Sequence, residues 1–110
     1  MPMKLDITCK MIELTNPLRA FVEEKIGSLD RGVPELKEGY AVVEIGKPSR
    51  HHKSGEVFYA EAMLKMGRAT LRAESTHHDL RAAIVDVREA LKAQLAKRKE
   101  KALARRTKKR

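Results

Sequence analysis

The sequence has 110 residues, of which 24 are Lys or Arg and 15 are Asp or Glu, giving a formal net charge of +9. This length suits one domain with a modest core, and the cationic excess favours nucleic acid or another anionic surface as partner. The single cysteine, Cys9, excludes an internal disulfide, and no apolar stretch approaches the roughly 20 residues of a membrane span. Because Lys4 and Asp6 stand where a signal peptide would be apolar, we expect a cytoplasmic protein with no membrane partner.

The N-terminal part predicts a strand and then a helix. Residues 4–9 alternate between polar and apolar, the period of a half-buried strand. Asn16 and Pro17 favour a helix start, with Asn16 as the capping residue and Pro17 in the first turn. This helix is expected to continue until Gly32 and Pro34 break it. Its apolar face comprises Leu18, Phe21, Val22, Ile26 and Leu29.

Three further strands are predicted over residues 40–45, 57–66 and 69–75. The middle one alternates apolar and polar side chains, as a strand does when one face of its sheet is buried. Gly67 and Arg68 suit a two-residue hairpin turn with glycine at its first position. The second of these strands therefore turns back directly into the third.

The segment from Thr76 to the C-terminus has the pattern of one long helix. Thr76 and Asp79, three residues apart, resemble a capping box at its start. Its apolar positions recur with the i, i+3, i+4, i+7 spacing of a helix that packs on a core. They are Leu80, Ala83, Ile84, Val87, Leu91 and Leu95.

Basic residues alone follow one edge of this apolar arc, and we call them the basic row. They are Arg81, Arg88, Lys92, Lys99 and Arg106. Asp86, Glu89 and Glu100 project to the far side of the helix. A row of one charge sign favours a surface that binds phosphates; the alternative is a solvated face with an accidental sign pattern.

The C-terminal end is the most basic part of the chain. From Lys97 onward there are nine Lys or Arg and one Glu. Because like charges repel along such a run, we expect the helix to fray beyond Leu103. The predicted division is a domain over residues 1–103 and a disordered basic tail over residues 104–110, which becomes ordered on its partner.

The order of elements is therefore β-α-β-β-β-α. We expect an α+β domain of two layers, with a four-stranded antiparallel sheet and two helices packed on one of its faces.

Other candidate sites are weaker. The loop from Gly46 to Gly55 carries Lys47, Arg50, His51, His52 and Lys53, and it suits a second RNA contact or a solvated hairpin tip equally well. We expect no metal site, because the adjacent histidine pairs diverge and lack acid or cysteine ligands at a suitable spacing. With no phosphate-binding loop and no nucleophile next to a base, we expect no catalytic residue, no cofactor and no small-molecule substrate. We interpret Cys9 as a core residue.

Three stretches carry a family pattern. They are Asn16-Pro17-Leu18-Arg19-Ala20-Phe21-Val22-Glu23-Glu24-Lys25, Leu71-Arg72-Ala73-Glu74 and Asp79-Leu80-Arg81-Ala82-Ala83-Ile84-Val85-Asp86. In this order, and on these elements, they resemble the ribosome hibernation-promoting factor and ribosome-associated inhibitor A family over residues 3–101.

The resemblance implies a domain that binds ribosomal RNA of the small ribosomal subunit, in the channel for messenger and for A-site and P-site transfer RNA. It implies inhibition of translation in resting or stressed cells. The RNA contacts that it implies are Arg19, Lys25, Arg88, Lys92, Lys97 and Lys99, to which the basic row adds Arg81 and Arg106. Long family members continue into a second domain that pairs ribosomes, so we expect a short form without self-driven ribosome dimerisation.

Two positions depart from the family pattern. Arg81 stands where the family usually has Tyr, and Ala90 replaces a common Lys. Arg81 keeps this face cationic, since a guanidinium both binds phosphate and stacks on bases. The alternative functions are a stand-alone RNA-binding or RNA-chaperone domain without a fixed ribosomal site, and an accessory subunit of an RNA-modifying enzyme or nuclease.

Overall fold

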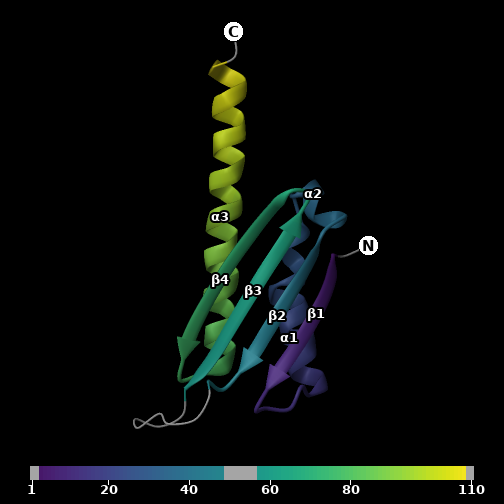
Figure 1. The fold of residues 1–110 in the computed structure, drawn as a ribbon, viewed down its shortest axis with the longest axis vertical. Helices are drawn as coiled ribbons and strands as arrows, with labels where there is room; N and C mark the ends of the chain where they lie inside the picture. Colours follow the sequence, from purple (N-terminus) through teal and green to yellow (C-terminus); the bar gives the residue numbers. More distant parts are fainter. Residues whose placement is uncertain (1–2, 49–56, 109–110) are drawn as a thin grey trace.

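A computed structural model describes residues 3–48 and 57–108, with side chains through residue 103 (Figure 1). The predicted order of strands and long helices is confirmed, with two short helices added. The elements are β1 (Lys4–Lys10), α1 (Asn16–Lys25), the 3-10 helix η1 (Gly27–Asp30), α2 (Pro34–Lys37), β2 (Tyr40–Gly46), β3 (Phe58–Met66), β4 (Ala69–His77) and α3 (Leu80–Lys108).

The four strands form one sheet in the order β1-β2-β3-β4. β3 is antiparallel to both β2 and β4, but β1 and β2 are parallel. The prediction of a wholly antiparallel sheet is therefore wrong at this one pair. Parallel neighbours need a long crossover connection, and the segment containing α1, η1 and α2 supplies it by returning the chain to the end of the sheet where β1 begins.

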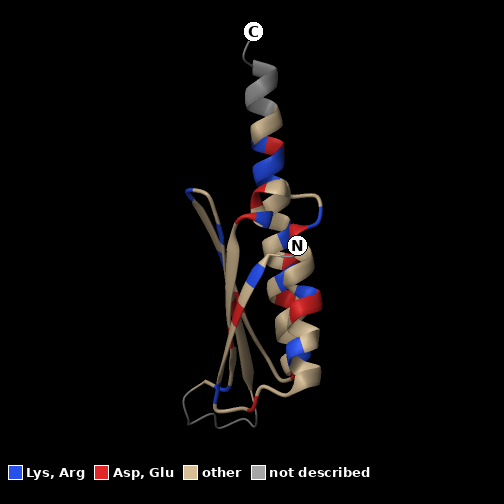
Figure 2. Ribbon diagram, turned by 90° about the vertical axis from the view of Figure 1, so that its right-hand side faces the viewer, with Lys and Arg blue, Asp and Glu red and all other residues tan. Residues whose placement is uncertain are grey.

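Both long helices cover the same face of the sheet (Figure 2). The sheet contributes Ala41, Val43, Ile45, Ala60, Ala62, Leu64 and Met66 to the core, and the helices contribute Leu18, Val22, Ala83, Ile84, Val87, Leu91 and Leu95. The predicted apolar arc of the last helix is thus confirmed, with Leu80 half-buried at its start. The two-layer α+β architecture is confirmed as well.

Thr15, rather than Asn16, caps α1. The Thr15 hydroxyl accepts a hydrogen bond from the Leu18 N–H at 3.3 Å, and Asn16 is the first helical residue. The predicted cap is therefore wrong by one residue. Thr and Asn both cap helices well, so residue type alone does not separate them. Pro17 lies in the first turn as predicted, where its missing N–H costs no helical hydrogen bond.

The predicted first helix is shorter than its apolar face. α1 ends at Lys25, and the chain tightens at Gly27, a poor helix former, into η1. Leu29 is buried in η1, and Pro34 opens α2 instead of only ending a helix. The side chain of Asp30 is buried and accepts the backbone N–H of Met3 at 2.9 Å, so η1 fastens the start of β1.

The start of α3 also differs from the prediction. Thr76 lies within β4, which runs two residues past its expected end at Ser75. The proposed capping box is wrong, because Asp79 itself caps the helix by accepting the Arg81 N–H at 3.1 Å on its carboxylate. His77 supports this turn, since its Nδ1 accepts the Asp79 N–H at 2.9 Å. The hairpin turn at Gly67 is confirmed, with φ of 58°.

α3 is longer than the sheet that it covers. Its 29 residues span about 43 Å, whereas the nine residues of β4 span about 30 Å. The C-terminal part of α3 consequently projects past the sheet (Figure 1). Among the residues whose side chains are described, which end at residue 103, Leu95 is the last buried position, and Leu103 is 52% exposed. The helix passes the predicted boundary at residue 103 and continues to Lys108, while the division into domain and tail stays a prediction.

The outer face of the sheet is polar and internally paired. The Tyr59 hydroxyl donates to Glu44 at 2.5 Å, Lys10 lies 4.0 Å from the same carboxylate, and Arg72 pairs with Glu61. Burial, the hydrogen bond to Glu44 and the charges of Glu44 and Glu61 raise the pKa of Tyr59 to about 12. Glu44 and Glu61 therefore oppose the approach of an RNA phosphate to Tyr59 itself.

The core position of Leu91 generates a first prediction. Leu91→Ala should lower the free energy of unfolding by about 2–5 kcal/mol, because it removes buried methyl groups and leaves a cavity. Leu103→Ala, the same change on the exposed part of the same helix, should cost less than about 0.5 kcal/mol. Urea unfolding of both variants is the measurement, and equal losses would contradict this account of α3.

The hydroxyl of Tyr59 generates a second prediction, on the pH dependence of stability. Because its pKa is raised above 10 in the folded state, the stability that it contributes is complete below pH 10 and is lost as the pH rises from 10 to about 12. Tyr59→Phe should therefore show a shallower loss of unfolding free energy over this pH range than the unchanged protein. Parallel stability curves for the two proteins would disprove the coupling.

Candidate nucleic-acid interface

The basic row lies along the edge of the apolar arc of α3, where the helix meets solvent. Arg81, Lys92 and Lys99 are exposed and Arg88 is half-buried, while the side chain of Arg106 lies outside the described residues. From Arg81 to Lys99 the row extends for about 27 Å along the helix. Figure 2, in which α1 lies in front of the lower part of α3, shows Lys and Arg on the part of α3 that projects past the sheet. A row of this length can contact several successive phosphates.

Two acids of α3 are closer to other groups than the sequence suggests. Arg88 donates a hydrogen bond to Glu89 at 2.7 Å, because the two long side chains bend toward each other. The expectation that Glu89 leaves the basic row undisturbed is therefore wrong. Asp86 accepts the Ser75 hydroxyl at 3.0 Å and so faces β4. An RNA phosphate that binds Arg88 must either displace Glu89 or share the Arg88 guanidinium with it.

Arg81 connects α3 to α1 through an aromatic ring. Its guanidinium carbon lies 4.8 Å from the centroid of the Phe21 ring, and the Lys25 ammonium lies 5.6 Å from the same centroid. Cation–π contacts of this kind contribute about 0.5–1 kcal/mol at exposed sites. The fold thus brings two predicted RNA-binding residues, from different helices, to one ring.

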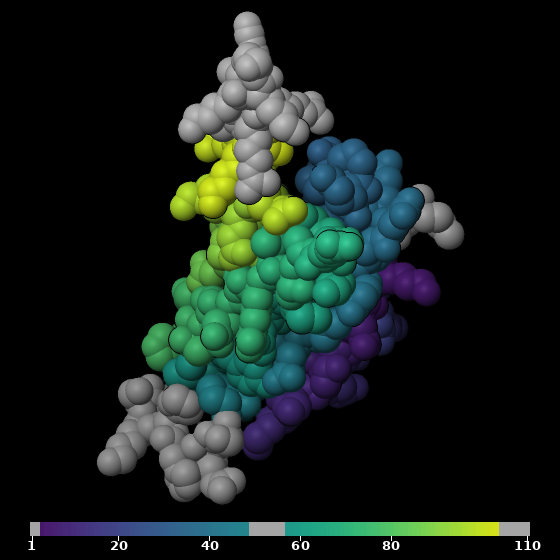
Figure 3. All heavy atoms as spheres, turned by 45° about the horizontal axis from the view of Figure 1, so that its top comes forward, coloured from purple at the N-terminus to yellow at the C-terminus, as the bar shows by residue number. Residues whose placement is uncertain are grey.

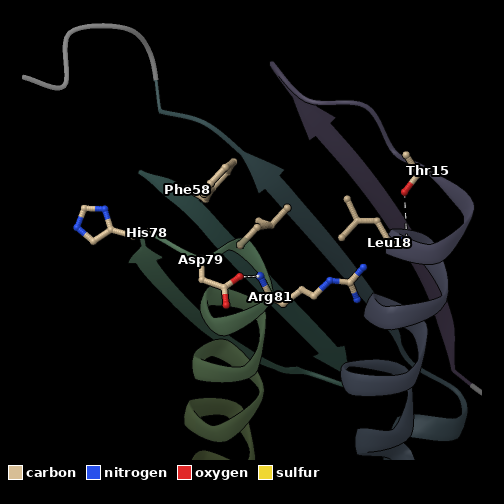
Figure 4. Close-up of a pocket in the computed structure, with 7 residues that line it drawn as sticks. Thr15, Leu18, Phe58, His78, Asp79 and Arg81 are labelled. Atoms are coloured by element: carbon tan, nitrogen blue, oxygen red, sulfur yellow. Dashed lines mark hydrogen bonds between the residues drawn. The ribbon is translucent and has the colours of Figure 1, made fainter. Parts of the chain in front are cut away.

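The end of the molecule near Arg81 is hollowed between the starts of α1 and α3. A hollow of about 470 Å³ lies there, and Figure 4 shows Arg81 reaching across from α3 toward α1. Its lining residues are Thr15, Leu18, Phe58, His78, Asp79, Leu80 and Arg81. The Thr15 hydroxyl and one carboxylate oxygen of Asp79 accept the capping bonds, so these two oxygens serve the helix starts.

Arg19 is separate from the basic row. It is exposed on α1, and its charge acts on Cys9 of β1: burial raises the pKa of the Cys9 thiol, and Arg19 partly offsets this. Glu23 and Glu24 are exposed on the same helix. The surface of α1 is therefore mixed in sign, unlike the basic row.

Three residues of the basic row meet other cations at a second, larger hollow, which we call the α3 groove. It lies between α3 and residues 28–35, and its volume is about 840 Å³. Arg88, Lys92 and Lys99 line one side and Arg31 the other, with Arg98 also on α3. Figure 3 shows the end of α3 in yellow and the segment around η1 and α2 in blue at this end of the molecule.

Sequence reasoning missed Arg31 and Arg98. Arg31 follows η1 and reaches α3 only through the tertiary fold, so no local pattern indicates it. Arg98 lies near the core side of α3 in helical projection, but at a level beyond the last buried residue, Leu95. Lys97, which was predicted, does not line the groove and points about 140° away from Lys92 around the helix.

The arrangement suits electrostatic binding. Long cationic side chains in a row contact phosphates without reading base sequence. Within residues 3–48 and 57–103, no group of three or more His, Cys, Asp or Glu side chains is placed to hold a metal ion. His51, His52 and most of the loop from Gly46 to Gly55 lie outside the described residues. In the part of the chain that is described, no helix is both long and apolar enough to cross a bilayer.

Two solved structures share this fold. The N-terminal domain of Protein Y from Thermus thermophilus matches with a TM-score of 0.63 at 24% identity, covering 86% of this chain and 94% of that one. A ribosomal subunit interface protein from Coxiella burnetii matches with a TM-score of 0.69 at 21% identity, covering 89% and 99%. At these identities the likeness establishes the architecture.

Sequence relatives fall into two lengths. Ribosome hibernation promotion factors from Deinococcus radiodurans and Lactococcus lactis are 30% and 34% identical over 78% and 87% of this chain, which spans only 44% and 49% of theirs. The ribosome hibernation promoting factor of Azotobacter vinelandii is 30% identical over 94% of this chain and 89% of its own.

The family comparison agrees with the resemblance drawn from the sequence, which is thereby confirmed. The model of the family described as Sigma 54 modulation protein / S30EA ribosomal protein matches residues 5–103, from β1 through the projecting part of α3. This chain belongs to that family.

Proposed function

We propose that this protein is a ribosome hibernation factor. It binds the small ribosomal subunit, at ribosomal RNA in the channel for messenger and for A-site and P-site transfer RNA, and it inhibits translation in resting or stressed cells. The observation that carries the proposal is the basic row of α3, with Arg88, Lys92 and Lys99 opposite Arg31. The names of the relatives as hibernation factors support it.

The mechanism is stoichiometric occupation and not catalysis. The basic row neutralises RNA phosphates and releases their counterions, which supplies affinity without requiring a particular base sequence. The two-layer domain then fills space that messenger or transfer RNA would otherwise take. Shape decides the location, because phosphate contacts alone position a protein on RNA but do not select a site.

Sedimentation with isolated small subunits tests the proposal. The protein should travel with small subunits at physiological salt and should inhibit translation in a purified system in proportion to its ratio to ribosomes. A protein that binds short RNAs equally well but stays behind when subunits sediment would instead be a stand-alone RNA-binding or RNA-chaperone domain.

The salt dependence of binding is a specific prediction. If about six phosphates are neutralised, affinity should fall on the order of a thousandfold between 50 and 200 mM salt. Equilibrium binding of the labelled protein to small subunits at several salt concentrations gives the slope. A flat response would exclude the basic row from the mechanism.

A double variant that replaces two cations by neutral side chains tests the basic row directly. Arg88→Gln with Lys92→Gln should weaken subunit binding about a hundredfold, the loss expected for two charge-assisted contacts of about 1.5 kcal/mol each. The salt slope should fall by about two, one for each phosphate contact removed. Both quantities come from the same binding titrations.

A matched control lies on the outer face of the sheet. Lys10→Gln with Arg72→Gln removes the same two charges, and Arg72 is paired with Glu61 much as Arg88 is paired with Glu89. Because Lys10 and Arg72 already lie beside Glu44 and Glu61, on a face that the proposed binding does not use, this variant should bind nearly as well as the unchanged protein. Equal losses for the two double variants would mean that total charge, and not the basic row, determines binding.

A further inference from the structure

Phosphate binding by the basic row leaves the interior of the α3 groove unexplained. The cations lie along its rim, while its floor includes Leu29, Met66 and Leu95, all less than 10% exposed. Its walls carry Val33 from the segment before α2 and Leu103 from the projecting part of α3. A surface meant only for RNA phosphates needs no such apolar interior.

The apolar wall on α3 has a definite origin. Leu95 and Ala102 are spaced i, i+7, so the core-facing side of the helix continues past the end of the sheet, and Leu103 lies about 80° further around the helix from Leu95, beside Lys99. At this level the sheet no longer covers the helix, and Leu103 is 52% exposed. The helix thus offers Ala102 and Leu103, on either side of Lys99, to something outside the domain.

The charges of the lining restrict the chemistry of an occupant. Among the described residues that line the groove, five are cations, namely Arg31, Arg88, Lys92, Arg98 and Lys99, and one is an acid, Glu35. An occupant that fits must therefore combine negative charge with an apolar part. The volume of the α3 groove, about 840 Å³, lies in the range of pockets that hold a ligand or several side chains.

The apolar part of the occupant fits a peptide better than a nucleobase. Sites for unpaired bases present aromatic rings for stacking, and the described lining of the α3 groove has none. Its aliphatic side chains and Met66 instead match Leu, Ile or Phe side chains, which amphipathic helices insert into apolar grooves at positions i, i+3, i+4 and i+7.

We propose that the α3 groove binds an acidic amphipathic helical segment of a partner protein. The apolar side chains of the segment lie on Leu29, Val33 and Leu103, and its carboxylates meet Arg31, Lys92 and Lys99 on the rim. Because Arg88, Lys92 and Lys99 also belong to the basic row, such a segment competes with RNA. The competition rests on the proposed function, whereas the groove site does not.

The test uses the full chain and a designed probe. The probe is a fluorescein-labelled peptide of about 14 residues, four helical turns, with Leu at i, i+3, i+4 and i+7 and Glu at most other positions. Fluorescence anisotropy without RNA should give a dissociation constant on the order of 10 µM for this peptide. A scrambled peptide of identical composition should bind at least about tenfold more weakly, since its leucines no longer share one face.

Single substitutions locate the site. Leu103→Ser should weaken peptide binding about tenfold, equivalent to about 1.4 kcal/mol, and leave binding to small subunits within about twofold. Met11→Ser is the matched control: Met11 is 70% exposed and follows β1 at the opposite end of the sheet, so this change should leave peptide binding unaltered. Arg88→Gln with Lys92→Gln should weaken the binding of both the peptide and the small subunit.

The outcomes separate the two proposals. Equal binding of ordered and scrambled peptides, no binding of the ordered peptide, or no effect of Leu103→Ser would overturn the peptide site. If Leu103→Ser weakens the binding of RNA as strongly as the binding of the peptide, the groove holds nucleotides and the peptide proposal is also wrong. A protein that binds the peptide at Leu103 yet fails to sediment with small subunits would keep the groove site while refuting the hibernation function.

Discussion

The sheet has one apolar face that must be covered, and this constraint places the other features of the molecule. α1 and α3 cover it together, with Val22, Ile84 and Leu91 among the fully buried side chains. Any residue at the edge of the apolar arc of α3 then emerges where the helix layer meets solvent. Arg88, which is half-buried, and Lys92, which is exposed, occupy this edge, so their cationic groups lie at the boundary between the helix layer and solvent.

The groove follows from a mismatch of lengths. A helix rises about 1.5 Å per residue and a strand about 3.3 Å, so a helix needs just over two residues for each strand residue that it covers. α3 has 29 residues against the nine of β4, which is more than three to one, so the helix is longer than the strand. The excess projects past the sheet with its apolar side uncovered by strands. Residues 28–35, which return the chain for the parallel strand β2, stand opposite it. The same crossover therefore provides both the sheet topology and the second wall of the groove.

Features encoded by a local period could be predicted from the sequence. The strand faces, the apolar arc of α3 and its neighbouring cations each follow from a repeat of two or of 3.6 residues. Strand direction could not be predicted in this way, because residues 4–9 alternate identically in a parallel or an antiparallel sheet. Arg31 was missed because its approach to α3 depends on the crossover. The pairing of Arg88 with Glu89 was missed because a projection places Cα positions and ignores how long side chains bend.

The two faces of the molecule handle charge differently. On the outer sheet face, Glu44 and Glu61 are matched by Tyr59, Lys10 and Arg72 within that face. Along α3 and around the groove, cations outnumber acids, so a ligand must supply the missing negative charge. Two ligands that need the same cations exclude one another directly, and no conformational change has to carry a signal between separate sites. Such exclusion follows from geometry, because Arg88, Lys92 and Lys99 belong both to the rim of the α3 groove and to the basic row.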